Sequence, residues 1–207
     1  MNFYFPSCHF KILFPKESNI IQKKFSHFVQ LECCRERLHH LKRDDLAVFI
    51  CTNCNLILKE NVCARVISIF EWILNDNEYV YPNLSGRTLI IQHCGKADEY
   101  HRRTVEKILI KMGAIIKISS IDDYCGYQLM QPISEKNLKA APEVFSKLNE
   151  RIEVLDMKLQ EERIQSIVEA YSGKTVVTYC NSCYQVLNQH GVNVYHLAQL
   201  LFNDNYV

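Results

Sequence analysis

Short apolar runs bounded by turn residues alternate along the chain with segments whose apolar residues recur every three or four positions. Short runs are typical of buried strands, and the three- to four-residue spacing is typical of helices. The clearest strands are expected at residues 46–50, 88–91, 114–118 and 175–179. The clearest helix is expected to begin after Asp98 and to end at Met112, before Gly113. This alternation predicts an α/β fold with mostly parallel strand pairing.

Weaker patterns extend the prediction to the rest of the chain. Further strands are expected at residues 3–5 and 29–31, further helices at 18–28, 35–42, 54–59 and 66–74, and a strand–helix tail at 192–202. The helix at 66–74 would turn Ile69, Trp72 and Ile73 toward the core. A long helix-rich insert is expected at about residues 134–171.

One strand–CxxC–helix unit occurs twice. Cys51 and Cys54 follow the first strand of this kind, and Cys180 and Cys183 follow the second one, 129 positions later. Such self-similarity indicates an internal repeat.

A turn-rich segment at residues 75–86 predicts a linker between the two copies. We therefore expect two pseudo-repeated α/β halves. The first half covers residues 1–78, and the second covers residues 79–207 and contains the helical insert.

Nine of the ten cysteines form two sets with the same order: a single cysteine, then a pair or its remnant, then CxxC. The first set is Cys8, Cys33, Cys34, Cys51 and Cys54, and the second is Cys94, Cys125, Cys180 and Cys183. Tyr124 replaces one cysteine of the pair in the second set, and Cys63 belongs to neither set. The cysteines fall at strand-to-helix junctions, where ligands gather in parallel sheets. The sequence therefore predicts one convergent cysteine site in each half.

The composition and charge of the chain limit which binding partners and which cellular compartment we expect. The net charge of +1 gives no electrostatic argument for nucleic acid, and no apolar run is long enough to span a bilayer. The first residues lack the pattern of a secretory signal, so we expect a cytoplasmic protein whose cysteines are thiols or metal ligands. The chain contains neither GxGxxG nor GxxxxGKS/T, which argues against a nucleotide-binding unit.

Three kinds of chemistry use cysteines at the N-terminus of a helix, where thiolates are favoured. A thioredoxin-like dithiol needs one CxxC, so the repeated outlying cysteines argue against it. Structural zinc takes four thiolates, the number that the second set supplies. An iron–sulfur cluster accommodates adjacent cysteines, and it is favoured for the five-cysteine first set.

The two cysteine sets and their flanking residues resemble the cysteine-rich CCG domains of heterodisulfide reductases. The segment YFPSCH resembles the opening strand and first ligand of that family. CTNCNLIL and CNSCYQVL resemble its closing motif, and YCGY resembles its CCG with one cysteine changed. Arg35 stands where the family has the glycine that follows the cysteine pair.

The resemblance implies a noncubane [4Fe–4S] cluster held by Cys8, Cys33, Cys34, Cys51 and Cys54. It also implies a second metal centre, either a [4Fe–4S] cluster or zinc, held by Cys94, Cys125, Cys180 and Cys183. The implied role is the catalytic subunit of an electron-transfer complex that acts on a small disulfide or thiol. A flavoprotein or a ferredoxin-like subunit would supply the electrons. The alternatives are a non-catalytic zinc-binding module and an electron relay that binds no substrate.

Two histidines and the insert are further candidates for function. His9 and His93 each adjoin the first cysteine of a set, where they could donate protons or orient the neighbouring loops. The position of the insert makes it a candidate docking site for the partner.

Overall fold

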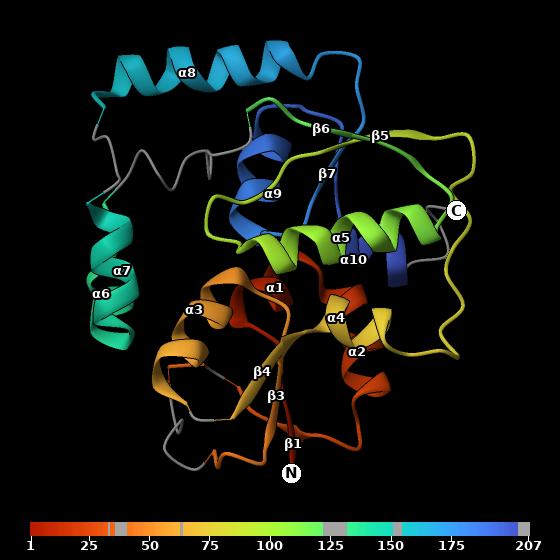
Figure 1. Ribbon diagram of the computed structural model, residues 1–207. Helices are drawn as coiled ribbons and strands as arrows, with labels where there is room; N and C mark the ends of the chain where they lie inside the picture. The colour runs from red at the N-terminus through yellow and green to blue at the C-terminus, as the bar shows by residue number, and fades with distance from the viewer. Residues whose placement is uncertain (33, 36–40, 63, 122–131, 151–154, 203–207) are drawn as a thin grey trace. The chain divides into compact units, whose positions relative to one another are not determined.

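The computed structural model describes residues 1–32, 34–35, 41–62, 64–121, 132–150 and 155–202 (Figure 1). Contacts between residues divide the chain into two compact units. The first unit contains Met1–Val80 and Ser134–Ser146, and the second contains Tyr81–Ile133 and Lys147–Val207. The boundary falls inside the turn-rich segment at residues 75–86. Residues 134–146 group with the first unit, whereas the sequence-based division places them in the second half.

A four-stranded parallel sheet in the order β2-β1-β3-β4 forms the centre of the first unit. Its strands are β1 (Asn2–Phe5), β2 (Val29–Gln30), β3 (Leu46–Phe49) and β4 (Arg65–Ser68). Its helices include α1 (Cys8–Leu13), α2 (Pro15–Lys24), α3 (Thr52–Asn61) and α4 (Ile69–Leu74). Figure 1 shows α3 on one face of this sheet and α2 and α4 on the other. Phe25, which follows α2, packs against Trp72 of α4 with ring centroids 4.7 Å apart.

The second unit is built on a four-stranded parallel sheet in the order β6-β5-β7-β8. Its strands are β5 (Thr88–Ile91), β6 (Ile115–Ile118), β7 (Val176–Thr178) and β8 (Val194–His196). Its helices include α5 (Glu99–Lys111), α8 (Met157–Ala170), α9 (Asn181–Gln189) and α10 (Leu197–Phe202).

The two units share one topology. In both sheets the first strand in the chain pairs with the second on one side and with the third on the other, and the fourth lies outside the third. The 129-residue offset of the CxxC motifs also relates α3 to α9 and β4 to β8. The structure therefore confirms an α/β fold made of two pseudo-repeated halves, and it pairs every strand of the described residues in parallel.

This strand order creates a switch point at the carboxyl ends of two neighbouring strands. From β1 the chain crosses to β2 on one side, and it later returns to β3 on the other side of β1. The connections that leave β1 and β3 therefore diverge, and this arrangement leaves space at the strand ends for a ligand. The same holds for β5 and β7 in the second unit.

The prediction of one amphipathic helix at residues 66–74 is wrong. Residues 65–68 form β4, and α4 begins only after Ser68, whose side chain accepts a hydrogen bond from the Glu71 backbone N–H at 3.0 Å. The β-branched Val66 and Ile67 fit a strand, and the serine cap starts the helix. Ile69 and Ile73 of α4 are buried, whereas Trp72 is half-buried.

Two N-terminal boundaries also differ from the prediction. Cys8 is the first residue of α1, a short helix absent from the sequence-based prediction, and Ser7 caps this helix by accepting from the Phe10 backbone N–H. The next helix begins at Pro15 rather than at Ser18 and ends at Lys24. Proline is well suited to the first turn of a helix because the N–H that it lacks has no partner there.

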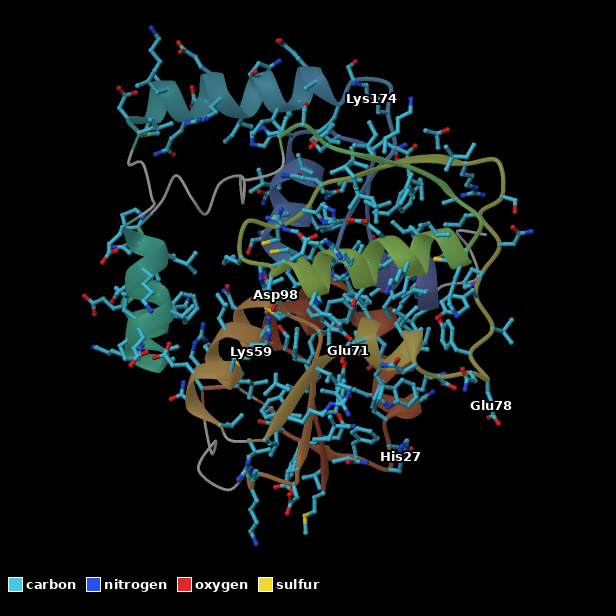
Figure 2. All side chains as sticks on the ribbon, in the orientation of Figure 1. His27, Lys59, Glu71, Glu78, Asp98 and Lys174 are labelled. Atoms are coloured by element: carbon cyan, nitrogen blue, oxygen red, sulfur yellow. The ribbon has the colours of Figure 1, made fainter. Side chains whose placement is uncertain are left out.

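The strongest periodic segment gives the closest agreement between sequence and structure. The Asp98 side chain caps α5 by accepting from the His101 backbone N–H at 2.8 Å (Figure 2), and Gly113 follows this helix with a φ of 79°. The predicted helix at 35–42 lies mostly outside the described residues.

Helix α8 packs against α9 in the core of the second unit. Ile167 and Tyr171 belong to one buried cluster with Val176, Leu187 and Val194. None of the helices in the described parts of the chain has the length and apolar character needed to cross a membrane.

The insert consists of α6 (Glu135–Ala140), α7 (Pro142–Asn149) and α8, and polar contacts join its first part to the C-terminal end of α3. The Glu60 carboxylate accepts from the backbone N–H groups of Glu143 and Val144, both at 2.9 Å. Asn61 donates to the Ala140 carbonyl at 2.8 Å. The carboxylate thus occupies the N-terminus of α7, where negative charge is favoured.

We expect Glu60→Ala to loosen residues 134–146, because it leaves two N–H groups at the start of α7 without their acceptor. Loss of such a cap costs about 1 kcal/mol. Limited trypsin digestion should then cleave faster at Lys136 and Lys139. Glu78→Ala, a change elsewhere in the first unit, is the control and should leave the rate unchanged. Equal rates in E60A and wild type would contradict the prediction.

Candidate metal centre

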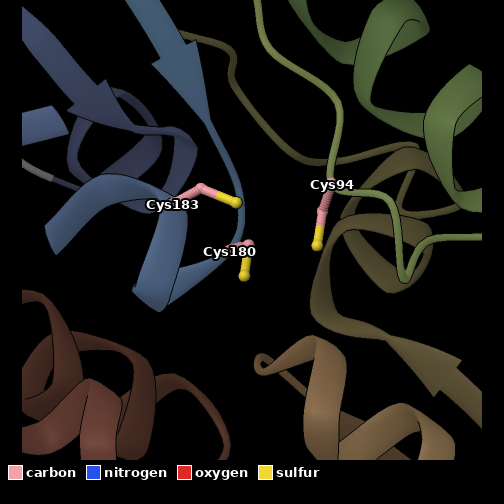
Figure 3. Close-up of side chains that lie close together, drawn as sticks. All are labelled: Cys94, Cys180 and Cys183. Carbon is pink, nitrogen blue, oxygen red and sulfur yellow. The ribbon is translucent and has the colours of Figure 1, made fainter. Parts of the chain in front are cut away.

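Three buried cysteines of the second unit converge. The Sγ atoms of Cys94, Cys180 and Cys183 all lie within 4.8 Å of one another. Each residue is at most 2% exposed. Figure 3 shows the three sulfur atoms turned toward a common space, with Cys94 on the segment after β5 and the other two at the junction of β7 and α9. This group can bind a metal ion or cluster through thiolates.

The helix that carries the CxxC motif favours thiolates. Cys180 is the N-cap of α9, and Cys183 lies in its first turn. The N-terminus of a helix carries a partial positive charge, which stabilises a nearby thiolate and makes it a better metal ligand.

A buried hydrogen-bond network ties this site together. The Tyr179 hydroxyl accepts from the Cys94 backbone N–H at 3.2 Å and lies 3.0 Å from Nδ1 of His93. The other ring nitrogen of His93 lies 3.1 Å from a Glu106 carboxylate oxygen. Burial raises the pKa of Tyr179 well above its ordinary value, so the hydroxyl keeps its proton.

Hydrogen-bond donors without a partner in the described part of the chain lie beside the CxxC motif in sequence and suit an anionic centre. Among the described residues, the Thr178 hydroxyl and both polar atoms of the Asn181 amide are buried without a hydrogen-bond partner. A buried donor left unpaired costs about 1–3 kcal/mol. Hydroxyl and amide donors would be satisfied by thiolate or sulfide sulfur, so the surroundings fit a thiolate-bound metal or cluster.

The first unit brings together three cysteines of the first set. The fully buried Cys54 thiol hydrogen bonds with Cys34 and with Cys51, and these contacts together with burial raise its pKa. The hydrogen bond from Cys54 lowers the pKa of Cys34. Binding of a metal here must therefore displace the proton of Cys54, because only the thiolate is a ligand.

The surroundings of this first group parallel those of the second. Cys51 is the N-cap of α3 with φ −105° and ψ 133°, close to the φ −114° and ψ 125° of Cys180. The buried Tyr4 hydroxyl and Asn55 side-chain oxygen have no hydrogen-bond partner among the described residues. Burial, followed by the charge of Cys54, raises the pKa of Tyr4.

The remaining predicted site residues divide into three groups. Cys8 is exposed on α1, and His9 beside it is half-buried. His93 is 2% exposed and has both ring nitrogens in hydrogen bonds, an arrangement that orients the segment carrying Cys94. Cys33, Tyr124 and Cys125 lie outside the described residues.

Sequence reasoning missed the side chains that support the thiols. Tyr179 was treated only as part of a strand, and Glu106 was not singled out within the helix expected after Asp98. Tyr179 directly precedes Cys180, and this position is the only sequence signal that could have drawn attention to it.

Searches against protein-family models, curated proteins and solved structures found no match for the chain.

We expect Cys183→Ser to weaken metal binding in the second unit at least about tenfold, because it replaces a soft thiolate with a poor ligand. The measurement is metal bound per chain after dialysis of anaerobically loaded protein. Cys63→Ser, which changes a cysteine outside both sets, is the control. Metal content in C183S equal to that in C63S would contradict the assignment of this site.

A second prediction concerns His196 on β8. Burial lowers its pKa from 6.5 to about 4, and its Nδ1 accepts from the Ala198 backbone N–H at 3.2 Å. Between these two pH values the unfolded chain binds a proton at this histidine and the folded protein does not. Stability is therefore present above pH 6.5 and is lost as the pH falls toward 4, by roughly 3 kcal/mol.

Urea unfolding of the metal-free, reduced protein across this pH range measures the loss. In His196→Asn the amide oxygen can still accept from Ala198, but the titrating group is gone. The other titrating groups contribute equally to both proteins, so they cancel when the unfolding free energy of the variant is subtracted from that of wild type. The remaining difference should change with pH as expected for a single histidine. Parallel stability–pH curves would show that the histidine does not contribute.

Proposed function

We propose that the protein is an iron–sulfur redox protein with one cysteine-ligated centre in each of its two α/β units. We further propose that it is the disulfide- or thiol-handling catalytic subunit of a heterodisulfide reductase-like electron-transfer complex. The observation that carries the proposal is the buried group of Cys94, Cys180 and Cys183 at the switch point of the second sheet, together with the contacts of the Cys54 thiol with Cys34 and Cys51 in the first unit. A structural metal needs no such duplication, whereas electron transfer to a disulfide needs two electrons.

The ligands of the first centre would be Cys8, Cys33, Cys34, Cys51 and Cys54. Cys54 contacts both Cys34 and Cys51, and all three are buried, so water is kept from their thiolates. A noncubane [4Fe–4S] cluster bound there would supply single electrons to a sulfur substrate. Cys8 is exposed on α1, whereas Cys34, Cys51 and Cys54 are buried.

The ligands of the second centre would be Cys94, Cys125, Cys180 and Cys183. The first, third and fourth of these form the buried group with Sγ atoms within 4.8 Å. Thr178 and Asn181 supply hydroxyl and amide groups beside Cys180 in sequence. Hydrogen bonds to cluster or ligand sulfur raise the reduction potential of such a centre, so these residues would help to set it.

Zinc is the second candidate for the centre of the second unit. Four thiolates around zinc, with bonds of about 2.3 Å in a tetrahedron, lie roughly 3.8 Å apart. The Sγ atoms of Cys94, Cys180 and Cys183 all lie within 4.8 Å of one another, which is compatible with this value. Thiolates that bind separate irons of a cluster lie farther apart, so the compact group favours a single ion there. This alternative leaves a protein with one redox centre and one structural centre.

The electrons would come from a flavoprotein or a ferredoxin-like subunit. The sequence contains no CxxCxxCxxxC run for relay clusters and no dinucleotide fingerprint, so a partner would carry both functions. In the insert, Phe145 and Leu148 are buried, and Met157 and Leu159 at the start of α8 are exposed. The exposed pair is the apolar part of the insert that we propose for docking.

Iron, acid-labile sulfide and zinc per chain, measured on anaerobically purified protein together with an EPR spectrum, test the proposal. We expect about four iron and about four sulfide with one zinc, or about eight of each without zinc. Cys51→Ser should remove the first centre and spare the second, and Cys180→Ser should do the reverse. Zinc without iron, when iron is abundant during expression, would rule out the redox function.

A further inference from the structure

The hydroxyl of Tyr179 connects the two backbone segments that carry the ligands of the second unit. Tyr179 directly precedes Cys180 at the end of β7, and His93 directly precedes Cys94 after β5. The strands β5 and β7 pair up to Gln92, whose N–H donates to the Val177 carbonyl at 3.0 Å. Beyond this point the two segments separate. The hydrogen bond from the Cys94 N–H to the Tyr179 hydroxyl, 3.2 Å long, then links them again beside the thiols.

The network around this hydroxyl allows one consistent arrangement of protons with a neutral imidazole. An ionised carboxylate only accepts hydrogen bonds, so Nε2 of His93 must donate to Glu106. Nδ1 of His93 is then an acceptor and receives the hydroxyl proton of Tyr179. A lone pair of the hydroxyl remains for the Cys94 N–H. Every group in this chain of contacts thus has a partner of the opposite kind.

Burial makes this network rigid. Tyr179 is 0% exposed and His93 is 2% exposed, whereas the Glu106 side chain is 31% exposed at the outer end. The Tyr179 ring packs edge-on against His101, with centroids 5.0 Å apart. Hydrogen bonds away from water are stronger, and the packed ring holds the hydroxyl in one place.

We propose that Tyr179 is a positioning residue of the second metal centre, whose hydroxyl sets the distance between Cys94 and the CxxC thiols while His93 and Glu106 orient that hydroxyl. This inference rests on the proposed metal centre in the second unit. This link through the Tyr179 hydroxyl is specific to the second unit, because the residue 129 positions before Tyr179 is Ile50, which has no hydroxyl. Partners that orient metal ligands are worth about 10- to 100-fold in metal affinity.

The test is Tyr179→Phe in the full chain, which removes the hydroxyl and keeps the ring. Cobalt is the probe, titrated anaerobically into protein that also carries Cys51→Ser and Cys54→Ser, so that the second centre alone reports. We expect a 10- to 100-fold weaker affinity and altered cobalt–thiolate absorption bands. In His93→Asn the side-chain oxygen can still accept the hydroxyl proton, so this variant should keep most of the affinity.

Tyr171→Phe is the matched control. Tyr171 is also buried in the second unit, and its hydroxyl lies 2.7 Å from the Ser119 hydroxyl. This variant should lose similar stability but keep the cobalt affinity and the absorption bands. A Y179F protein that behaves like Y171F in both would overturn the positioning role.

Exchange of the Cys94 backbone amide provides a measurement without metal. In the metal-free, reduced protein this amide should exchange at least about tenfold faster in Y179F than in Y171F, because it has lost its acceptor. Equal exchange rates in the two variants would overturn the proposed link between the Tyr179 hydroxyl and the Cys94 N–H. Wild-type protein that binds neither cobalt, zinc nor iron at this site would instead overturn the proposed function, and the positioning role with it.

Discussion

Parallel pairing of the first and third strands in each unit is the constraint on which the sites depend. Because β1 pairs with β3, and β5 with β7, in parallel, both members of each pair end at the same edge of their sheet. The connections that follow then diverge toward opposite sides, so neither covers the strand ends. The chain places CxxC immediately after the third strand, and the N-terminus of the next helix stabilises the thiolates there. The order and direction of the strands therefore place cysteine-bearing segments that are distant in sequence at the same edge of a sheet.

Burial of these thiols has a consequence for the metal-free protein. The Cys54 thiol resists ionisation, because its hydrogen bonds with Cys34 and Cys51, and then its burial, raise its pKa. Among the described residues, the hydroxyl groups of Tyr4 and Thr178 and the side-chain amide of Asn181 are also buried without hydrogen-bond partners. A bound metal reverses both costs, because it holds the sulfur atoms as thiolates and turns them into strong acceptors. We therefore expect metal binding to stabilise each unit.

The sequence predicted the repeat and the fold class, because both depend on local pattern, and of the second predicted cysteine set the structure brings together Cys94, Cys180 and Cys183. Asp98 and Gly113 mark a helix through their own backbone preferences, and CxxC after an apolar run marks a strand-to-helix junction. Residues 66–74 were misread because their apolar positions fit a strand and a helix equally well, and only Ser68 separates the two elements. The support of Cys94 by Tyr179 crosses 85 positions, and that of α7 by Glu60 crosses 83 and 84. Side-chain contacts between residues so far apart in the chain leave no periodic pattern in the sequence that could predict them.

The two units share a backbone but not the surroundings of their cysteines, and this difference bears on the two metals. In the second unit the Tyr179 network fixes Cys94 against a compact group of thiols, as a small ion with strict geometry requires. In the first unit Ile50 replaces that tyrosine, and the set gains an adjacent cysteine pair and the exposed Cys8. A larger centre with several irons tolerates such spread, and an exposed ligand suits contact with a substrate. For these reasons we propose one redox centre beside one rigid centre rather than two equivalent ones.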